Sequence, residues 1–94
     1  MIKHVVCFKL KKGESAKKAA EILLSMQGRV PEISAMEVGV DFLGSDRSYD
    51  VILQVVLADK DALTRYQNDP YHCSVVKKYM HAARESSVAV DYEI

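Results

Sequence analysis

The chain has 94 residues, of which 49% are hydrophobic and 28% are charged, and its 13 Lys and Arg balance its 13 Asp and Glu. This length predicts a single domain over residues 1–94, and this composition is typical of a globular fold with a core rather than of a disordered segment. The balanced charge argues against a nucleic-acid partner, and the short basic cluster Lys9, Lys11 and Lys12 is interpreted as a solvated strand end.

Nothing in the sequence predicts a membrane partner or secretion. No apolar run approaches the length of a membrane span, and the residues after Met1 enter a strand pattern instead of a charged-then-apolar leader. Cys7 and Cys73 match no zinc or redox spacing; a disulfide between them stays open, with two free thiols as the default interpretation. We therefore expect a cytoplasmic protein in a reducing compartment.

The first half of the chain predicts a strand, a helix and a hairpin. Residues 2–10 alternate between apolar and polar positions, which is typical of a strand. Apolar residues then recur every three or four positions over 15–29, which predicts an amphipathic helix that ends near Gly28 and Pro31. Residues 36–42 and 49–57 alternate again around a turn at 44–48, so these two strands should pair as an antiparallel hairpin.

The second half predicts two helical segments and a last strand. Asp59 is a suitable N-cap for a short helix that contains Leu63 and Tyr66, and Pro70 can open another helix. Residues 88–94 alternate as a final strand. The order βαββααβ predicts an α+β, ferredoxin-like fold: an antiparallel sheet with helices on one face.

Both faces of this predicted sheet carry apolar side chains. One face is almost wholly apolar and should carry the helices; its members are Ile2, Val6, Phe8, Met36, Val38, Phe42, Val51, Leu53, Val55, Val88 and Val90. The other face is mixed; it holds Val5, Cys7, Ile52, Val56 and Ala89 among Glu37, Asp50, Gln54 and Asp91. An apolar patch on a solvated face favours cover by a second copy of the same sheet, so we expect a homodimer in preference to a monomer with scattered surface valines.

Short segments spread over nearly the whole chain carry a family resemblance. They are Met1 to Val6, Phe8 to Lys11, Val30 to Ile33, Met36 to Gly39, Tyr49 with Asp50, Tyr66 to His72, and Val88 to Tyr92. Together they resemble the stress-responsive A/B barrel (Dabb) family. The resemblance implies a homodimer whose two sheets close a dimeric α+β barrel. Most members of that family have no known activity, but one plant branch is a cofactor-free polyketide (olivetolic acid) cyclase.

The resemblance to the cyclase branch implies candidate site residues. The tyrosine and the histidine that perform its aldol chemistry match Tyr66 and His72, and a further pocket histidine matches His4. His72 would act as the base and Tyr66 would donate a hydrogen bond to the enolate oxygen. Val6 and Phe8 share the face of His4 and are expected to bind substrate with it.

Other matches to the cyclase pattern are weaker. Asp91 matches a family aspartate that orients a histidine, but strict alternation puts it on the face opposite to His4. The helix over 15–29 lacks the cyclase's aromatic residues, Asp69 stands where a histidine is common, and Tyr71 adds bulk beside His72. Whether the pocket is smaller, differently charged or closed is therefore open, and so is a purely structural role for His4 in the core.

Two functions follow from these observations. The first is a non-catalytic or unassigned homodimer that binds a small apolar molecule or supports a stress response. The second is a cofactor-free cyclase or lyase-type enzyme that acts on a carbonyl, polyketide-like compound. We expect His81 on the surface, no metal-ligand set and no cofactor, because no ligand spacing or phosphate-binding loop is present.

Overall fold

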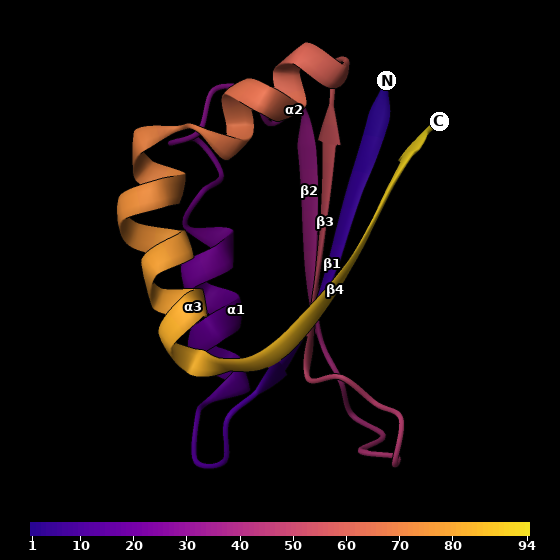
Figure 1. Cartoon of the computed structure of the whole chain (residues 1–94), viewed down its shortest axis with the longest axis vertical. Helices are drawn as coiled ribbons and strands as arrows, with labels where there is room; N and C mark the ends of the chain where they lie inside the picture. The colour runs from indigo at the N-terminus through magenta and orange to yellow at the C-terminus, as the bar shows by residue number, and fades with distance from the viewer.

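Four strands form one antiparallel sheet in the order β2-β3-β1-β4, and the helices lie together against one of its faces (Figure 1). The computed structural model describes residues 1–94. Its elements are β1 (Ile2–Leu10), α1 (Ala16–Leu24), β2 (Ala35–Val40), β3 (Val51–Leu57), α2 (Lys60–Gln67), η1 (His72–Lys77), α3 (Lys78–Ala83) and β4 (Arg84–Glu93). This arrangement confirms the predicted α+β, ferredoxin-like fold and the order βαββααβ.

Side-chain caps explain where two of the helices begin. Ser15 Oγ accepts a hydrogen bond from the backbone N–H of Lys18 at 3.1 Å, and Asp59 Oδ1 accepts one from the N–H of Ala62 at 2.8 Å. Each bond satisfies an amide that has no partner inside its helix. α1 ends at Leu24, earlier than the predicted boundary at residue 29, and turns lead from there to Gly28, whose φ of 82° suits glycine.

The helical segment that carries His72 begins with a cap from Asp69. Asp69 Oδ1 accepts hydrogen bonds from the N–H groups of Tyr71 at 2.9 Å and His72 at 3.1 Å. Pro70 has no N–H group and therefore leaves no unsatisfied donor at the start of the helix. The segment from His72 to Lys77 (η1) is π-helical and continues directly into α3. Sequence periodicity does not predict this local widening, which in other proteins is frequent at functional sites.

The core lies between the sheet and the helices. Its buried side chains from the sheet are Ile2, Phe8, Leu10, Val51, Leu53, Val55 and Leu57, and those from the helical layer are Ala19, Leu23, Met26, Val30, Ala62, Tyr66, Val76, Met80 and Ala83. The predicted helix-facing side of β1 and β3 is therefore confirmed. Burial of these apolar side chains supplies most of the driving force for folding.

The predicted orientation of the last strand is wrong. β4 pairs with β1 so that Val88 lies opposite Cys7 and Val90 lies opposite Val5, on the face away from the helices. Asp91 lies opposite His4, on the helix-facing side. Alternate side chains of a strand point to opposite faces, so a register that differs by one residue reverses every assignment.

The prediction for Phe42 is also wrong. β2 ends at Val40, and Phe42 is 97% exposed in the loop that leads to β3. The predicted antiparallel pairing of β2 with β3 is confirmed by a register in which Val38 lies opposite Leu53. The hairpin connection is a loop over 41–50, longer than the predicted turn.

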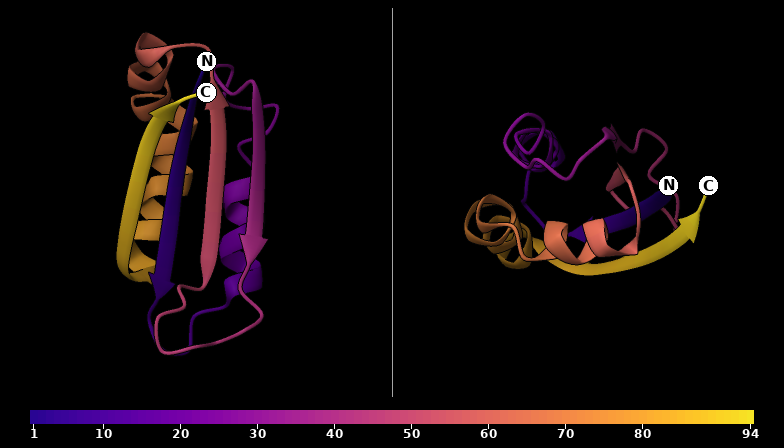
Figure 2. Two further views of the ribbon diagram at one scale, coloured as in Figure 1. Left: turned by 90° about the vertical axis from the view of Figure 1, so that its right-hand side faces the viewer. Right: turned by 90° about the horizontal axis from the view of Figure 1, so that it is seen from above.

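The face of the sheet away from the helices has no cover within the chain (Figure 2). Strand pairing places on it Val5, Cys7, Gly39, Ile52, Val56, Val88, Val90 and Tyr92, together with the polar residues Lys3, Glu37 and Gln54. We call this set the open face. Val90 is 63% exposed and Val88 is 50% exposed, so the apolar patch extends onto β4, beyond the predicted patch.

Candidate functional site

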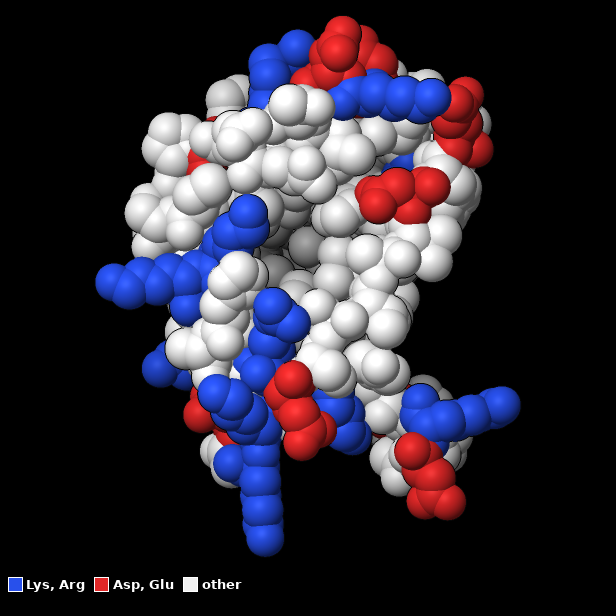
Figure 3. All heavy atoms as spheres, in the orientation of Figure 1, with Lys and Arg blue, Asp and Glu red and all other residues white.

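A cavity of about 500 Å³ lies between the sheet and the helical layer, and its opening is visible as a hollow in the surface (Figure 3). Its lining residues are His4, Val6, Phe8, Leu23, Leu53, Tyr66, Gln67, Asn68, His72, Val76, Lys77, Met80, His81, Arg84 and Ser87. All the predicted site residues, which came from β1, α2 and η1, are in this set. The pocket is therefore open rather than closed.

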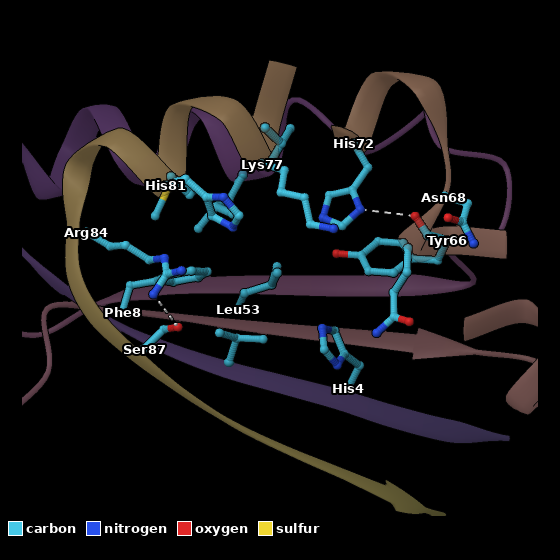
Figure 4. Close-up of a pocket in the computed structure, with 15 residues that line it drawn as sticks. His4, Phe8, Leu53, Tyr66, Asn68, His72, Lys77, His81, Arg84 and Ser87 are labelled. Atoms are coloured by element: carbon cyan, nitrogen blue, oxygen red, sulfur yellow. Dashed lines mark hydrogen bonds between the residues drawn. The ribbon is translucent and has the colours of Figure 1, made fainter. Parts of the chain in front are cut away.

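Three aromatic rings stand side by side at one end of the cavity (Figure 4). The ring of Tyr66 stacks on the imidazole of His72 with 4.4 Å between centroids, and it meets the imidazole of His4 edge-on at 5.7 Å. Tyr66 thus separates the two histidines and holds both rings in place. The opposite end holds Phe8, Arg84 and Ser87.

The position of the proton on the His72 ring follows from its hydrogen bond. His72 Nδ1 lies 3.0 Å from the backbone carbonyl oxygen of Tyr66, which can only accept, so Nδ1 carries the hydrogen. In the neutral ring, Nε2 then has the free lone pair. Burial lowers the pKa of His72 from its ordinary value of 6.5, the bond to the Tyr66 carbonyl opposes this shift, and the charge of Lys77 adds to it. His72 is therefore a neutral imidazole at pH 7, which is the form a base requires.

The phenol of Tyr66 is protonated and enclosed. The residue is 0% exposed, and its hydroxyl donates to Met26 Sδ at 3.8 Å. Burial raises the pKa of Tyr66 well above its ordinary value, so the hydroxyl remains a hydrogen-bond donor at every physiological pH. A thioether is only a weak acceptor.

His4 is held by Asp91 across the β1–β4 pair. His4 Nδ1 donates to Asp91 Oδ1, and the His4 side chain is 12% exposed. Asp91 thus orients the His4 ring and leaves its Nε2 as the unpaired nitrogen. Strict alternation of the sequence predicts Asp91 on the other face, so this contact depends on the register in which β4 pairs with β1.

Several cavity residues were missed from the sequence. The missed residues include Lys77, His81 and Arg84. Their spacing of four and three positions puts them on one face of a helix, and this spacing is the signal that could have revealed them. His81 is exposed, as predicted, but it lies at the cavity wall. Tyr71 points away from the cavity, because its hydroxyl donates to Ser25 Oγ of the α1 C-cap at 2.8 Å.

No group of three or more His, Cys, Asp or Glu side chains is arranged so that it could hold a metal ion. None of the helices combines the length and the apolar character that crossing a bilayer requires.

Comparison with known proteins now identifies the family. The model of the Stress responsive A/B Barrel Domain (Dabb) matches residues 2–94. The chain belongs to this family. No curated protein matches.

Solved structures show the same fold. A dimeric protein of unknown function and ferredoxin-like fold from Bacteroides fragilis is 23% identical, with a TM-score of 0.84 over 99% of this chain and 95% of that one. A Dabb family protein with a ferredoxin-like fold from Mesorhizobium loti is 22% identical, with a TM-score of 0.74 over 99% and 95%. The hydroxynitrile lyase of Passiflora edulis is 20% identical, with a TM-score of 0.78 over 99% and 92%. At these identities, the similarity of this Dabb protein to its neighbours concerns the fold alone.

The lowered pKa of His72 predicts a pH dependence of stability. Below pH 6.5 the unfolded chain binds a proton that the folded chain does not yet bind, so the free energy of unfolding should fall as the pH is lowered through this value. Urea unfolding at about pH 7.5 and about pH 5.5, at one protein concentration, should show a smaller loss for His72→Gln than for the wild type. His81→Gln, at an exposed position, is the matched control. Equal losses in the wild type and His72→Gln would contradict the buried, neutral state of His72.

Proposed function

We propose that this Dabb protein is a homodimer in which each subunit binds a small, largely apolar molecule in the cavity between its sheet and its helices. The observation that carries the proposal is the convergence of His4, Val6, Phe8, Tyr66 and His72 on one cavity of about 500 Å³. Binding sites for small molecules usually have about this volume, an apolar lining and a few polar groups. The expected setting is the cytoplasm, because Cys7 and Cys73 are both free.

The open face supports the homodimer. Helices already cover one side of the sheet, while Val88, Val90 and Tyr92 leave large apolar surfaces exposed on the other. A twofold axis through this face would pair it with itself and remove both copies from water, at about 25 cal/mol per Å² of apolar surface. The Bacteroides fragilis neighbour is described as dimeric, which agrees with this arrangement.

A charge on the open face should separate the subunits. In Val90→Glu the new carboxylate would have to be buried in the interface, so analytical ultracentrifugation at micromolar concentration should show a shift from dimer to monomer. Val75→Glu makes the same change at an exposed position of η1 in the helical layer and should remain dimeric. A wild-type protein that sediments as a monomer would refute the homodimer.

The cavity supports binding of an apolar chain. Val6, Phe8 and Leu53 form its sheet wall, and Val76 and Met80 form the wall on the helical side. The polar groups of His4, Tyr66 and His72 are gathered at one end, so an elongated molecule with a carbonyl or hydroxyl group at that end fits this part of the lining.

A large side chain inside the cavity should weaken the binding of an apolar ligand. Octan-1-ol, titrated into labelled protein and followed by NMR, should shift amide signals of cavity residues in the wild type. Val6→Trp places a large ring in the cavity and should weaken binding at least about tenfold, whereas Val75→Trp, outside the cavity, should not change it. If octan-1-ol produces no shifts at the cavity, or if Val6→Trp binds it as well as the wild type, the binding proposal is wrong.

One observation favours a second candidate, a cofactor-free cyclase or lyase-type enzyme that acts on a carbonyl compound. The bond to the Tyr66 carbonyl leaves the free lone pair of His72 on Nε2, in an imidazole that borders the cavity. His72 Nε2 would remove a proton from the carbon next to the carbonyl, and the electron pair of the broken C–H bond would move to the carbonyl oxygen. The hydroxyl of Tyr66 would donate to the resulting enolate oxygen.

Proton exchange tests this second candidate without knowledge of the natural substrate. In D₂O the protein should accelerate deuterium incorporation next to the carbonyl of octan-2-one beyond the rate with free imidazole at the same concentration. His72→Gln should lose about a hundredfold or more of this rate, and Tyr66→Phe should lose about a hundredfold. A wild-type rate no faster than imidazole, or an unchanged rate in His72→Gln, would remove the enzymatic candidate and leave the binding proposal in place.

A further inference from the structure

The Lys and Arg side chains of the cavity wall are not balanced by acidic ones, although the chain as a whole is neutral. Thirteen Lys and Arg balance thirteen Asp and Glu over the sequence, yet the lining contains Lys77 and Arg84 and no Asp or Glu. Figure 3 shows basic side chains gathered beside the hollow on the helical side.

Neither cation is neutralised within the chain. The ion pairs of the structure join Asp91 to His4, Asp50 to Lys9, Glu93 to Lys60 and Glu32 to Arg65. Arg84 has a neutral partner instead, because its Nη1 donates to Ser87 Oγ at 3.3 Å. A guanidinium next to apolar side chains and without a carboxylate has donors left for an anion.

Arg84 and the histidine–tyrosine rings lie at opposite ends of the cavity. In Figure 4, Arg84 and Ser87 lie beside Phe8, whereas Tyr66 and His72 lie over the His4 end of β1. Phe8 lies four positions after His4 on β1, which is about 13 Å along the strand. Leu53 lies between the two ends, so the middle of the cavity is apolar.

We infer that Arg84, with Ser87, forms an anion subsite and that the ligand of this cavity is an acidic molecule: an apolar chain with a carboxylate at the Arg84 end. The inference rests on the proposed binding function and adds the charge of the ligand to it. Arg84 presents a planar pair of N–H groups that matches the two oxygens of a carboxylate. Lys77, further along the wall, adds a second positive charge to the same cavity.

A matched set of eight-carbon ligands tests the head group. Octanoate, octan-1-ol and octylamine share the chain and differ in charge, and each would be titrated into labelled wild-type protein under the same NMR conditions. Octanoate should bind at least about tenfold more tightly than octan-1-ol, and octylamine more weakly than both. The advantage of octanoate should shrink as salt is added.

Substitutions of Arg84 test whether this residue causes the preference for octanoate. Arg84→Gln should weaken octanoate at least about tenfold and leave octan-1-ol within about twofold, so that octan-1-ol binding also reports an intact fold. Arg84→Lys should keep part of the preference, because the charge remains. Arg47→Gln makes the same change of charge in the exposed 41–50 loop and should bind all three ligands as the wild type does.

The outcomes separate this inference from the proposal on which it rests. If octanoate and octan-1-ol bind equally, or if Arg84→Gln weakens both to the same extent, the anion subsite is refuted while an apolar binding cavity stands. If octylamine binds most tightly, the subsite is likewise refuted. If none of the three ligands binds at the cavity, the proposed binding function itself fails.

Discussion

β4 pairs with β1 so that Asp91 lies opposite His4 and Val90 lies opposite Val5. This one register supplies both distinctive surfaces of the molecule. On the helix-facing side it brings the carboxylate that orients His4 at the cavity, and on the other side it extends the apolar patch of the open face. A shift of one residue would turn Asp91 away from His4 and place Val88 and Val90 toward the helices.

The two faces of the sheet perform different tasks because the helices cover only one of them. The layer formed by α1, α2, η1 and α3 packs on β1 and β3 along most of its length and leaves a cavity near β4. The side chains around this cavity are held by local backbone features: Asp69 caps the turn that carries His72, and the Tyr66 carbonyl sets the orientation of the His72 ring. The open face carries a few polar side chains, including Gln54 opposite Val5, but its large apolar side chains are uncovered and suit another apolar surface.

Charge is distributed unevenly in a chain that has no net charge. Asp50, Glu93 and Glu32 form ion pairs on the surface and Asp91 binds His4. Lys77 and Arg84 border the cavity without a carboxylate. The same environment keeps His72 neutral and Tyr66 protonated, since burial disfavours the charged form of each. A neutral imidazole, a phenol donor and unpaired cations around a cavity with an apolar middle suit a ligand that carries both a carbonyl and an acidic group.

Local patterns in the sequence determined the order of the elements, the cap at Asp59, and the faces of β1 and β3, because these depend on neighbouring residues and on one long apolar stripe. The gathering of His4, Tyr66 and His72 was accessible only through a family resemblance. Tertiary structure alone decided the orientation of β4, the exposed position of Phe42, the Asp91–His4 contact and the place of Arg84 at the cavity. The physical reason is that residues 88–94 have apolar side chains at alternate positions and small or acidic ones between them, beside a sheet that is apolar on both faces. Hydrophobic alternation then fits either orientation, and only pairing with a strand more than eighty positions away selects one.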